Sequence, residues 1–566
     1  MRYPELLAGE DDGPPAFELP PGLTSAQRDA ITADDPVLCV IAGAGAGKTR
    51  VLTLRVARRI REGSMDPDRV VVCTFSRKAA SELRARLFHL GVVHGINAGT
   101  FHRIALSLIR QRRIDERLAP LTVLSDRRRV LDSLDKRSTS ADSRESTKGS
   151  RSAGSYSSSR PQDGSPRSSR SRSLSQIDTE IGWAKSRMIP PDRYPSEAEY
   201  HMRRTSMSKA AIAEVYQRYE DERKRKGLLD LDDLLWTCVE MLDQDPQFAQ
   251  GVRWRFRHLF VDEMQDVNPV QFRLLLSILN DDPDLFVVGD PNQSVYQWNG
   301  SDPRLLETFP ETVNGARVIR LDENHRSSPQ IVSVANAVIG VRDDRAGFSS
   351  RTDGPAPELH GFVTDGEEAA WVARKVWLSH SPGTRWSHQA ILARTNAQLT
   401  LLTEALAKEH VPFNVAGSDL GPASDLTRPA DTGEETADTN HDMGNDYDDA
   451  VTVATFHRAK GLQWPTVFVI GLSESLVPIS QARTPEAIDE ERRLLYVALT
   501  RAELNLYCSW ATYRDTQVKD VKHERAPSRW LKEIEETLST LETAVRLSDP
   551  DAVSKNVAAL KAMLDS

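Results

Sequence analysis

Glycine and alanine alternate over residues 42–47, and a lysine and a threonine follow them directly. This run, AGAGAGKT, matches the pattern GxxxxGK[ST] except that Ala42 stands in the first glycine position. Small residues let backbone N–H groups approach phosphate groups closely, and the start of a following helix adds a favourable dipole. Lys48 would then reach the β- and γ-phosphates of a nucleotide, and the Thr49 hydroxyl would bind Mg²⁺.

Two acidic residues, Asp262 and Glu263, end the apolar segment RHLFVDE. A carboxylate at the tip of a buried strand could hold Mg²⁺, and its neighbour could orient or deprotonate an attacking water. For the pair alone, capping of a helix is the alternative. Together with the glycine-rich loop, the pair indicates hydrolysis of a nucleoside triphosphate.

A phosphate group in transit needs positive charge from outside the glycine-rich loop. Arg326 in DENHRSSPQ and Arg501 in YVALTRAEL lie far along the chain, and a guanidinium contacts phosphate oxygens bidentately. Taken singly, each arginine would be a surface ion-pair partner. The motifs around the two arginines favour the functional interpretation.

The elements that must position these residues alternate along the chain. Residues 37–40 are apolar and β-prone, and RVLTLRVARRI after the loop has helical spacing. Further strand-like runs are RVVVCTF, RHLFVDE, DLFVVGD, ARVIRLD, HQAILAR and TVFVIGL. Strands that alternate with helices predict an α/β fold with parallel sheets, one before and one after about residue 305.

Composition limits the class of protein. The chain has 566 residues and a net charge of −9, but residues 419–449 alone carry ten Asp or Glu and one Arg. The remainder is near neutral and could hold a basic groove for nucleic acid. The four cysteines are scattered without a CxxC pair, which predicts a reducing cytoplasm, no disulfide framework and no zinc site. No apolar run approaches the roughly 20 residues of a membrane span, and the acidic N-terminus is no signal peptide.

Two segments depart from globular composition. Residues 137–175 are nearly all Ser, Arg, Gly and Asp, and residues 418–449 are acidic with Pro and Gly. Neither segment can bury enough apolar surface to offset the entropy of ordering. We therefore predict a disordered loop and an acidic linker; the arginines of the loop either touch a phosphate backbone or lie solvated.

Nine motifs, in order, resemble the UvrD/Rep/PcrA group of superfamily 1 DNA helicases. They are LTSAQRDAI (23–31), AGAGAGKTR (42–50), VVCTFSRKAASELRARL (71–87), AGTFHRIALSLIR (98–110), VDEMQDVNPVQ (261–271), VVGDPNQSVYQWNGSD (287–302), LDENHRSSPQI (321–331), VATFHRAKGLQWPTVFVIGL (453–472) and EERRLLYVALTRAE (490–503). The resemblance implies two RecA-like P-loop NTPase domains with parallel sheets that close on ATP and reopen after hydrolysis.

The resemblance also implies an order of segments. They are a flexible leader (1–20), the first RecA-like domain (1A; 21–110 and 228–305), a helical insertion (1B; 111–227), the second RecA-like domain (2A; 306–417 and 450–540), the acidic linker (418–449) and a C-terminal tail (541–566). In the family a further helical domain, 2B, usually interrupts 2A. Here the acidic linker stands in its place, so 2B is expected to be missing.

Roles for individual residues follow from the resemblance. The catalytic set would be Lys48, Asp262, Glu263, Gln293, Arg326 and Arg501, with Gln293 on the γ-phosphate and the two arginines as fingers. The ATP-binding set would be Gln27, Ala42, Gly43, Ala44, Gly45, Ala46, Gly47, Lys48, Thr49, Arg50, His325 and Gln463, and the Mg²⁺ ligands Thr49 and Asp262. The DNA-binding set would be Phe75, Phe101, His102, Tyr296, Trp298, Thr455 and His457, whose aromatic members stack on bases. For Phe75 and Phe101, core packing is the alternative.

Four positions depart from the family pattern. His325 replaces a tyrosine that stacks on adenine, and Gln463 replaces a glutamate near the ribose. Asn299 replaces an arginine, and Arg77 replaces an asparagine. The resemblance then implies relaxed base selectivity and weaker coupling between ATP and DNA, with hydrolysis retained.

The expected function is an ATP- and Mg²⁺-dependent 3′-to-5′ helicase acting on single-stranded DNA and on junctions of single and double strands, in repair or replication restart. A translocase that strips proteins from single strands but barely unwinds duplex is the main alternative. A non-catalytic DNA-binding scaffold is a third interpretation, and an RNA substrate is also open, because stacking platforms accept RNA.

Overall fold

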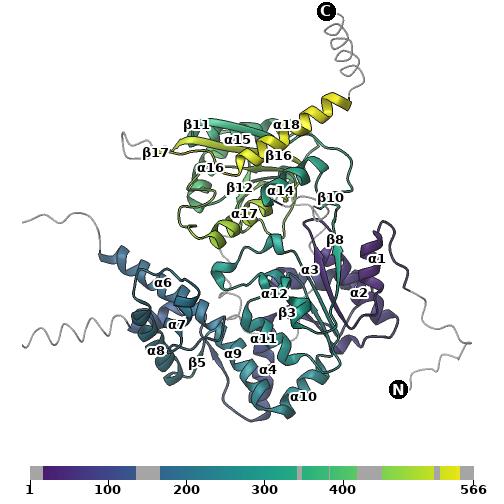
Figure 1. The fold of residues 1–566 in the computed structure, drawn as a ribbon, viewed down its shortest axis with the longest axis vertical. Helices are drawn as coiled ribbons and strands as arrows, with labels where there is room; N and C mark the ends of the chain where they lie inside the picture. The colour runs from purple at the N-terminus through teal and green to yellow at the C-terminus, as the bar shows by residue number, and fades with distance from the viewer. Residues whose placement is uncertain are drawn as a thin grey trace, which may run out of the picture.

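A computed structural model describes residues 17–134, 166–340, 347–381, 383–416, 449–514 and 523–548. Two sheets of parallel strands form its two halves, and a helical insertion lies beside the first half (Figure 1). The predicted α/β fold with two parallel sheets is confirmed.

The first sheet has six strands, all parallel to their neighbours. In spatial order they are β3 (Asn97–Thr100), β2 (Val70–Thr74), β6 (His258–Val261), β7 (Leu285–Gly289), β1 (Val37–Ala42) and β8 (Arg317–Leu321). Because the strands are parallel, the loops after β1, β2, β6 and β7 all emerge at one edge of the sheet. The glycine-rich loop and Asp262 follow two of these strands.

Helices cover both faces of this sheet, because successive side chains of a strand point to opposite faces and both sets are apolar here. Leu38 and Val40 of β1 pack on one side, and Val37 and Cys39 pack on the other. The first side is covered by α1 (Ser25–Thr32), α2 (Lys48–Arg61) and α3 (Arg77–His89), and the second by α4 (Phe101–Asp115), α9 (Leu231–Gln244), α10 (Pro246–Arg255) and α11 (Pro269–Ile278).

The helical insertion has a core of its own. It contains α6 (Pro166–Lys185), α7 (Tyr194–Tyr200) and α8 (Lys209–Arg225), with the short strands β4 (Thr122–Val123) and β5 (Leu228–Leu229) paired at its base. The disordered loop predicted for residues 137–175 is wrong at its C-terminal end, because α6 begins at Pro166. Ile177 and Ile181 of α6 are buried in the insertion core, and the helix extends from them towards its N-terminus. Residues 135–165 lie outside the described residues.

The second sheet is again parallel except for one short strand. Its order is β11 (Glu358–Thr364), β16 (Ala502–Arg514), β15 (Trp464–Val469), β12 (Gln389–Ala393), β14 (Val451–Thr455) and β13 (Phe413–Val415), with β17 (His523–Glu524) antiparallel to β16. One face packs against α14 (Pro329–Ile339), α17 (Pro485–Leu499) and α18 (Leu531–Ser548), and the other against α15 (Asp365–Ser379) and α16 (Asn396–Lys408).

The division between the two halves lies later than the expected position near residue 305. The short helices α12 (Arg304–Glu307) and α13 (Phe309–Thr312) contribute to the first core, and β8 pairs with β1. The first sheet therefore extends to Leu321. The chain then enters the second half through β9 (Glu323–Asn324), which pairs with β10 (Phe348–Ser349).

The predicted acidic linker lies almost entirely outside the described residues, which omit 417–448. The strands on either side of it, β13 and β14, are paired neighbours. Residues 1–16 of the predicted leader and 549–566 of the predicted tail also lie outside the described ranges.

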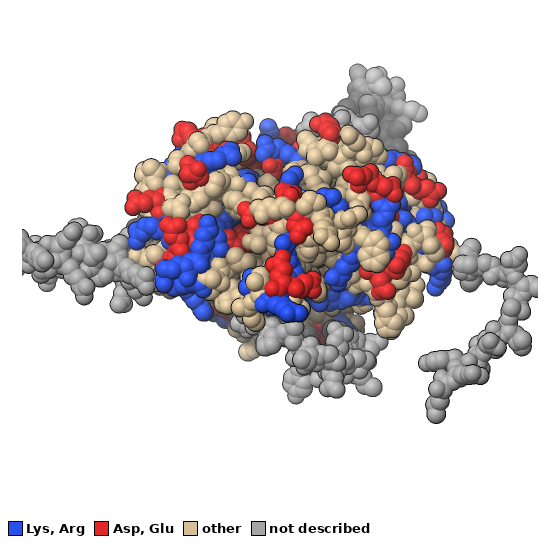
Figure 2. All heavy atoms as spheres, turned by 90° about the horizontal axis from the view of Figure 1, so that it is seen from below, with Lys and Arg blue, Asp and Glu red and all other residues tan. Residues whose placement is uncertain are grey.

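Surface composition agrees with a near-neutral body. On the face shown in Figure 2, lysine and arginine are interspersed with aspartate and glutamate, and no field of one sign covers the face. The four cysteines are buried and free. None of the helices in the described ranges combines the length and apolar character that crossing a bilayer requires.

Candidate active site and nucleic-acid interface

The glycine-rich loop connects β1 to α2 at the carboxyl edge of the first sheet. Gly47 caps α2 in a left-handed conformation with φ of 82°, and Gly45 has φ of 71°. A Cβ atom at Gly45 would lie 2.5 Å from Asn324 Oδ1 and 2.8 Å from Arg326 Cβ. Glycine is therefore required at residue 45 both by the backbone angle and by the close approach of the segment that enters the second half.

Lys48 and Thr49 face acidic residues that directly follow two neighbouring strands, β6 and β7. The Lys48 ammonium donates to the backbone oxygens of Ala42 (3.3 Å) and Gly43 (3.4 Å) and lies 4.0 Å from Asp290 Oδ2. Thr49 Oγ1 donates to Asp262 Oδ2 at 3.1 Å. The structure thus brings the lysine, the hydroxyl and two carboxylates together.

The acidic pair after β6 has two different electrostatic environments. Burial, followed by the neighbouring charge of Glu263, raises the pKa of Asp262 to about 6. Burial also disfavours ionised Glu263, but Lys460 and Lys48 outweigh it and lower the pKa of this carboxyl below its usual value. Glu263 is therefore ionised at neutral pH, and Asp262 becomes protonated more readily than an ordinary aspartate.

Arg501 reaches the site from the second half, at the end of α17. Its side chain is 1% exposed, and its guanidinium donates to the backbone oxygens of Val497 (2.9 Å) and Leu462 (3.1 Å). A third nitrogen lies 3.5 Å from Gln293 Oε1, and Gln293 donates to Asp290 at 2.7 Å. Burial, together with the charge of Arg326, lowers the pKa of Arg501 to about 9.

Arg326 follows β9 and contacts the residue that precedes Arg501. Its Nε donates to Gln463 Oε1 at 2.7 Å, and its Nη1 donates to the backbone oxygen of Thr500 at 3.3 Å. The close approach of its Cβ to Gly45 places it beside the glycine-rich loop. Arg326 thus lies beside the loop of the first half, whereas Arg501 contacts Gln293 after β7.

Gln27 and His325 contact the glycine-rich loop at Ala46 and Gly45. Gln27 Nε2 donates to the Ala46 oxygen at 3.0 Å and lies 3.2 Å from His325 Nε2. The backbone N–H of His325 donates to the Gly45 oxygen at 3.1 Å. Arg50 points to the outside, where its guanidinium donates to the Pro21 oxygen at 3.4 Å. The remaining small residues of the loop, Ala44 and Ala46, are buried.

The oxygen pair of Thr49 and Asp262 fits Mg²⁺, which binds few protein ligands and completes its octahedron with phosphate oxygens and water. Within the described ranges, no group of three or more His, Cys, Asp or Glu side chains could hold a metal ion by itself. The donor set is thus suited to an ion that arrives with a triphosphate and not to a resident transition metal.

Aromatic side chains cluster on the loops that follow β2, β7 and β14. The rings of Phe75 and Tyr296 stack with centroids 4.6 Å apart, and Trp298 and His457 lie 6.3 and 6.5 Å from Tyr296. Phe75 is 39% exposed and Trp298 59% exposed. Exposed rings next to each other are the arrangement on which bases of a single strand stack.

The remaining DNA-binding candidates are less accessible. Phe101 is 6% exposed and belongs to the first core, which favours the core-packing alternative. Burial lowers the pKa of His102 at the start of α4. Thr455 is buried at the end of β14, and burial, followed by Arg394, lowers the pKa of His457 to about 4, so that this imidazole is neutral at pH 7.

Two groups at the site, Lys460 and Asp290, had no assigned role in the sequence analysis. Lys460 forms an ion pair with Asp266, donates to the Gln293 oxygen at 2.7 Å and lies over the Tyr296 ring. Asp290, directly after β7, contacts both Lys48 and Gln293. Lys460 lies within the motif TFHRAKG and Asp290 within VVGD, but only the fold shows which partners they meet.

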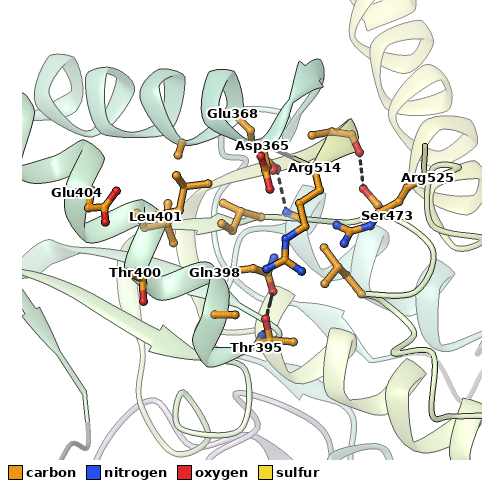
Figure 3. A pocket seen from close by; sticks show the side chains of 17 residues that line it. Asp365, Glu368, Thr395, Gln398, Thr400, Leu401, Glu404, Ser473, Arg514 and Arg525 are labelled. Carbon is orange, nitrogen blue, oxygen red and sulfur yellow. Dashed lines mark hydrogen bonds between the residues drawn. The ribbon is translucent and has the colours of Figure 1, made fainter. Parts of the chain in front are cut away.

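A separate hollow of about 400 Å³ lies at the carboxyl edge of the second sheet (Figure 3). Arg514 and Arg525 line it together with Asp365 and Glu368 of α15. The buried Glu368 accepts a hydrogen bond from the Gly471 N–H at 2.9 Å, so it ties α15 to the loop after β15. None of the residues that line this hollow belongs to the site beside the glycine-rich loop.

Comparisons with known proteins agree with this geometry. The model of the UvrD/REP helicase N-terminal domain matches residues 23–314, and that of the UvrD-like helicase C-terminal domain matches residues 319–419 and 434–513. The ATP-dependent DNA helicase UvrD2 of Mycobacterium tuberculosis is 31% identical over 610 residues, which cover 91% of this chain and 81% of that protein. The ATP-dependent DNA helicase PcrA of Staphylococcus epidermidis is 26% identical, with 91% and 87% covered.

Both halves of the chain are therefore matched in the order in which the fold presents them, with the glycine-rich loop in the first half and Arg501 in the second. The chain belongs to the UvrD/PcrA-type family of ATP-dependent DNA helicases.

Proposed function

We propose that this enzyme is a 3′-to-5′ helicase that moves on single-stranded DNA and acts in DNA repair or replication restart. The observation that carries the proposal is that Arg501 of the second half contacts Gln293 of the first, which bonds to Asp290 beside Lys48. The exposed ring of Trp298 follows in the same loop after β7. Direction and pathway are expectations from the resemblance to the UvrD/Rep/PcrA group.

In this proposal the site binds ATP with Mg²⁺, which neutralises phosphate charge and so favours transfer of the γ-phosphoryl group to water. Thr49 and Asp262 hold the ion, Lys48 binds the phosphates, and Glu263 orients the water. Gln27 and His325 contact the base, and Gln463 lies near the ribose. Gln27 and His325 contact the loop at Ala46 and Gly45, whereas Asp262 contacts Thr49, which supports this division of roles.

The second RecA-like domain supplies the positive charge. Arg501 and Arg326 bind the γ-phosphate from the side opposite Lys48, and Gln293 senses it from between them. Withdrawal of the phosphate removes the anion that holds two buried guanidinium groups near each other. The two domains then separate, which gives one step along the strand.

Single-stranded DNA and its junctions with duplex are the proposed partners. Bases stack on Phe75, Tyr296 and Trp298, while His457 and Thr455 lie near the backbone. The neutral state of His457 at pH 7 supports a hydrogen-bonding contact, not an ion pair. His102 follows β3, which pairs with the strand before Phe75, and this places it on the same side as the track; Phe101 belongs to the first core.

A specific observation favours the translocase alternative. Strands β13 and β14 are paired neighbours, and the 32 residues from 417 to 448 are all that the structure leaves undescribed between them. Segments below about 40 residues rarely form a folded domain without staples. We propose that 2B is missing and that unwinding is controlled differently from the relatives that contain it.

The first test measures ATP hydrolysis with no nucleic acid, with oligo(dT) and with oligo(U). We expect stimulation by the DNA, and loss of hydrolysis in Lys48→Ala. ATP hydrolysis that persists in Lys48→Ala would contradict the ATP site proposed here. Equal stimulation by oligo(U) would contradict the choice of DNA over RNA.

The DNA track is tested by the affinity for oligo(dT) of Trp298→Ala. Stacking of one base is worth about 1–3 kcal/mol, so we expect roughly 5- to 150-fold weaker binding. Trp254→Ala is the matched control, since this tryptophan is 67% exposed but packs against Arg69 at the start of β2, at the opposite edge of the sheet. Equal losses in the two variants would refute the proposed track.

Displacement of streptavidin from biotinylated oligonucleotides separates translocation from unwinding. We expect ATP-dependent release from a biotin at the 5′ end and much slower release from the 3′ end. Release from the 3′ end alone would reverse the proposed direction. Release without strand separation on a tailed duplex would establish the translocase alternative.

A further inference from the structure

The turn that carries Trp298 is held by the second RecA-like domain. This turn, the 3-10 helix η5 (Gln297–Asn299), follows β7 in the first half. Glu490 lies near the N-terminal end of α17, in the second RecA-like domain. It accepts a hydrogen bond from the Gln297 N–H at 2.8 Å and a second from the backbone of Trp298. One carboxylate of the second domain thus caps the turn on which the exposed indole is mounted.

The same helix face reaches the ATP site. Arg493, three residues after Glu490, donates from Nε to the Ser294 oxygen at 3.0 Å. Tyr496, a further three residues along, forms a hydrogen bond with the backbone of Ala44 in the glycine-rich loop. Side chains three residues apart share one helix face, and six residues span about 9 Å of helix. The face therefore contacts the DNA turn at one end and the phosphate loop at the other.

The far side of the turn is fixed by the helical insertion. Gly300 has φ of 94°, and a Cβ at this residue would lie 2.4 Å from Ser186 Oγ. Arg187 donates from Nη1 to the Gly300 oxygen at 3.3 Å. Because this side belongs to the first half, it stays in place when the two RecA-like domains separate. The Glu490 side of the turn, in contrast, depends on the position of the second domain.

We propose that Glu490 is a positioning residue that sets the orientation of Trp298 according to the closure of the ATP cleft. With the domains closed, the carboxylate holds the two backbone N–H groups and the indole faces the DNA. When the domains separate, α17 withdraws the carboxylate and the turn loses its cap. The grip on the strand thereby weakens once in each ATP cycle. This inference rests on the proposed function, because it presumes that Trp298 stacks on DNA.

The test compares oligo(dT) affinity and the oligo(dT) concentration for half-maximal ATPase in Glu490→Ala, Glu490→Gln and the control Asp489→Ala. Asp489 is an exposed neighbour on the same helix. We expect about tenfold weaker DNA binding in Glu490→Ala, about the size of one net hydrogen bond. The amide oxygen of glutamine still accepts a hydrogen bond, so Glu490→Gln should recover most of this loss. A glutamine variant as weak as the alanine variant would overturn the proposal.

A double variant shows whether Glu490 acts through Trp298. In a Trp298→Ala background, we expect Glu490→Ala to change DNA affinity by less than about twofold, because coupled residues are not additive. A tenfold loss in that background would show that the residue acts elsewhere and would overturn the proposal. A higher KM for ATP with wild-type DNA affinity would do the same. Equal thermal unfolding temperatures for Glu490→Ala and Asp489→Ala would show that weaker DNA binding does not come from a folding defect.

The outcomes separate this inference from the proposed function. If Lys48→Ala still hydrolyses ATP, or Trp298→Ala still binds DNA as the wild type does, the proposed function fails. If both behave as expected and Glu490→Ala binds DNA normally, only the positioning role fails.

Discussion

At the scale of single residues, the site is defined by charges that the fold has removed from water. Arg501 is buried, none of the described carboxylates forms an ion pair with it, and its pKa is lowered to about 9. Its donors are satisfied by backbone oxygens and by Gln293. A buried cation without a paired anion is costly, which suits a group whose partner is a transferred phosphate.

Replacement of Arg501 by lysine tests this interpretation. Lysine keeps the charge but loses the planar fork that contacts two oxygens at once. We expect kcat for ATP hydrolysis to fall by roughly 10²- to 10³-fold, because an arginine finger contributes about 10³ or more. The KM for ATP should change by less than about threefold in the same steady-state assay. Arg483→Lys, at an exposed arginine, is the control, and a kcat within threefold of wild type in Arg501→Lys would contradict the finger role.

Sequence patterns predicted the residues of the site better than their contacts. The GxxxxGK[ST] spacing identified Lys48 and Thr49, because phosphate binding dictates the order of residues along one loop. Glu490 and Lys460 act through partners some 170 to 190 residues away, and no local pattern encodes such pairs. Phe101 shows the converse limit, since an aromatic residue after a strand can face either the DNA or the core.

At the scale of elements, parallel strands determine where the chemistry can lie. Apolar runs predicted the strands well, because both faces of each sheet are covered by helices. The predicted boundaries were less accurate, as β8 and α6 show. An isolated strand carries no mark of the sheet that it joins, and the polar start of α6 depends on the packing of its later turns.

Asp284, just before β7, links helix α2 to strand β6. It accepts two hydrogen bonds of 2.8 Å from Arg59 of α2 and lies 2.5 Å from His258 Nδ1 of β6. Burial alone would raise the pKa of Asp284, but His258 and Arg59 outweigh it and hold this pKa well below its usual value. The ionised carboxylate therefore contributes stability above the unfolded pKa of about 4, and this contribution is lost as the pH falls towards the depressed pKa of the folded state.

We expect Asp284→Asn to lower the free energy of unfolding by about 2 kcal/mol at pH 7. The difference from the wild type should narrow between pH 4 and pH 2.5, measured by urea unfolding. Asp282→Asn is the control, because Asp282 pairs with Arg257 at an exposed position where an ion pair contributes less than about 1 kcal/mol. A difference that grows towards acid pH would contradict the assignment.

Gly300 joins the helical insertion to the DNA turn. Gly300→Ala would force a methyl group against Ser186 and strain a left-handed backbone, whereas Gly227→Ala meets nothing within 4 Å at its φ of 63°. The control should cost about 1–2 kcal/mol for the backbone alone, and Gly300→Ala about 1–3 kcal/mol more. The Val270 N–H, which donates to the Ser186 oxygen at 2.9 Å, should exchange with deuterium faster in Gly300→Ala only. Equal exchange in both variants would exclude this junction.

At the scale of the whole molecule, the two parallel sheets meet near the glycine-rich loop, where α17 of the second half contacts Ser294 and Ala44 of the first. The insertion contacts the turn that carries Trp298. The two family models match these two halves in the same order. Compared with the family pattern, the proposed difference is the direct pairing of β13 with β14 where 2B would interrupt the chain.

Strand separation tests the central claim most directly. The measurement is ATP-dependent release of a labelled strand from a 3′-tailed duplex and from a 5′-tailed duplex, with Lys48→Ala as the control. We expect release from the 3′-tailed duplex alone, and none with Lys48→Ala, because hydrolysis at the glycine-rich loop drives movement along the tail. Release from the 5′-tailed duplex alone, or release that persists in Lys48→Ala, would contradict the account.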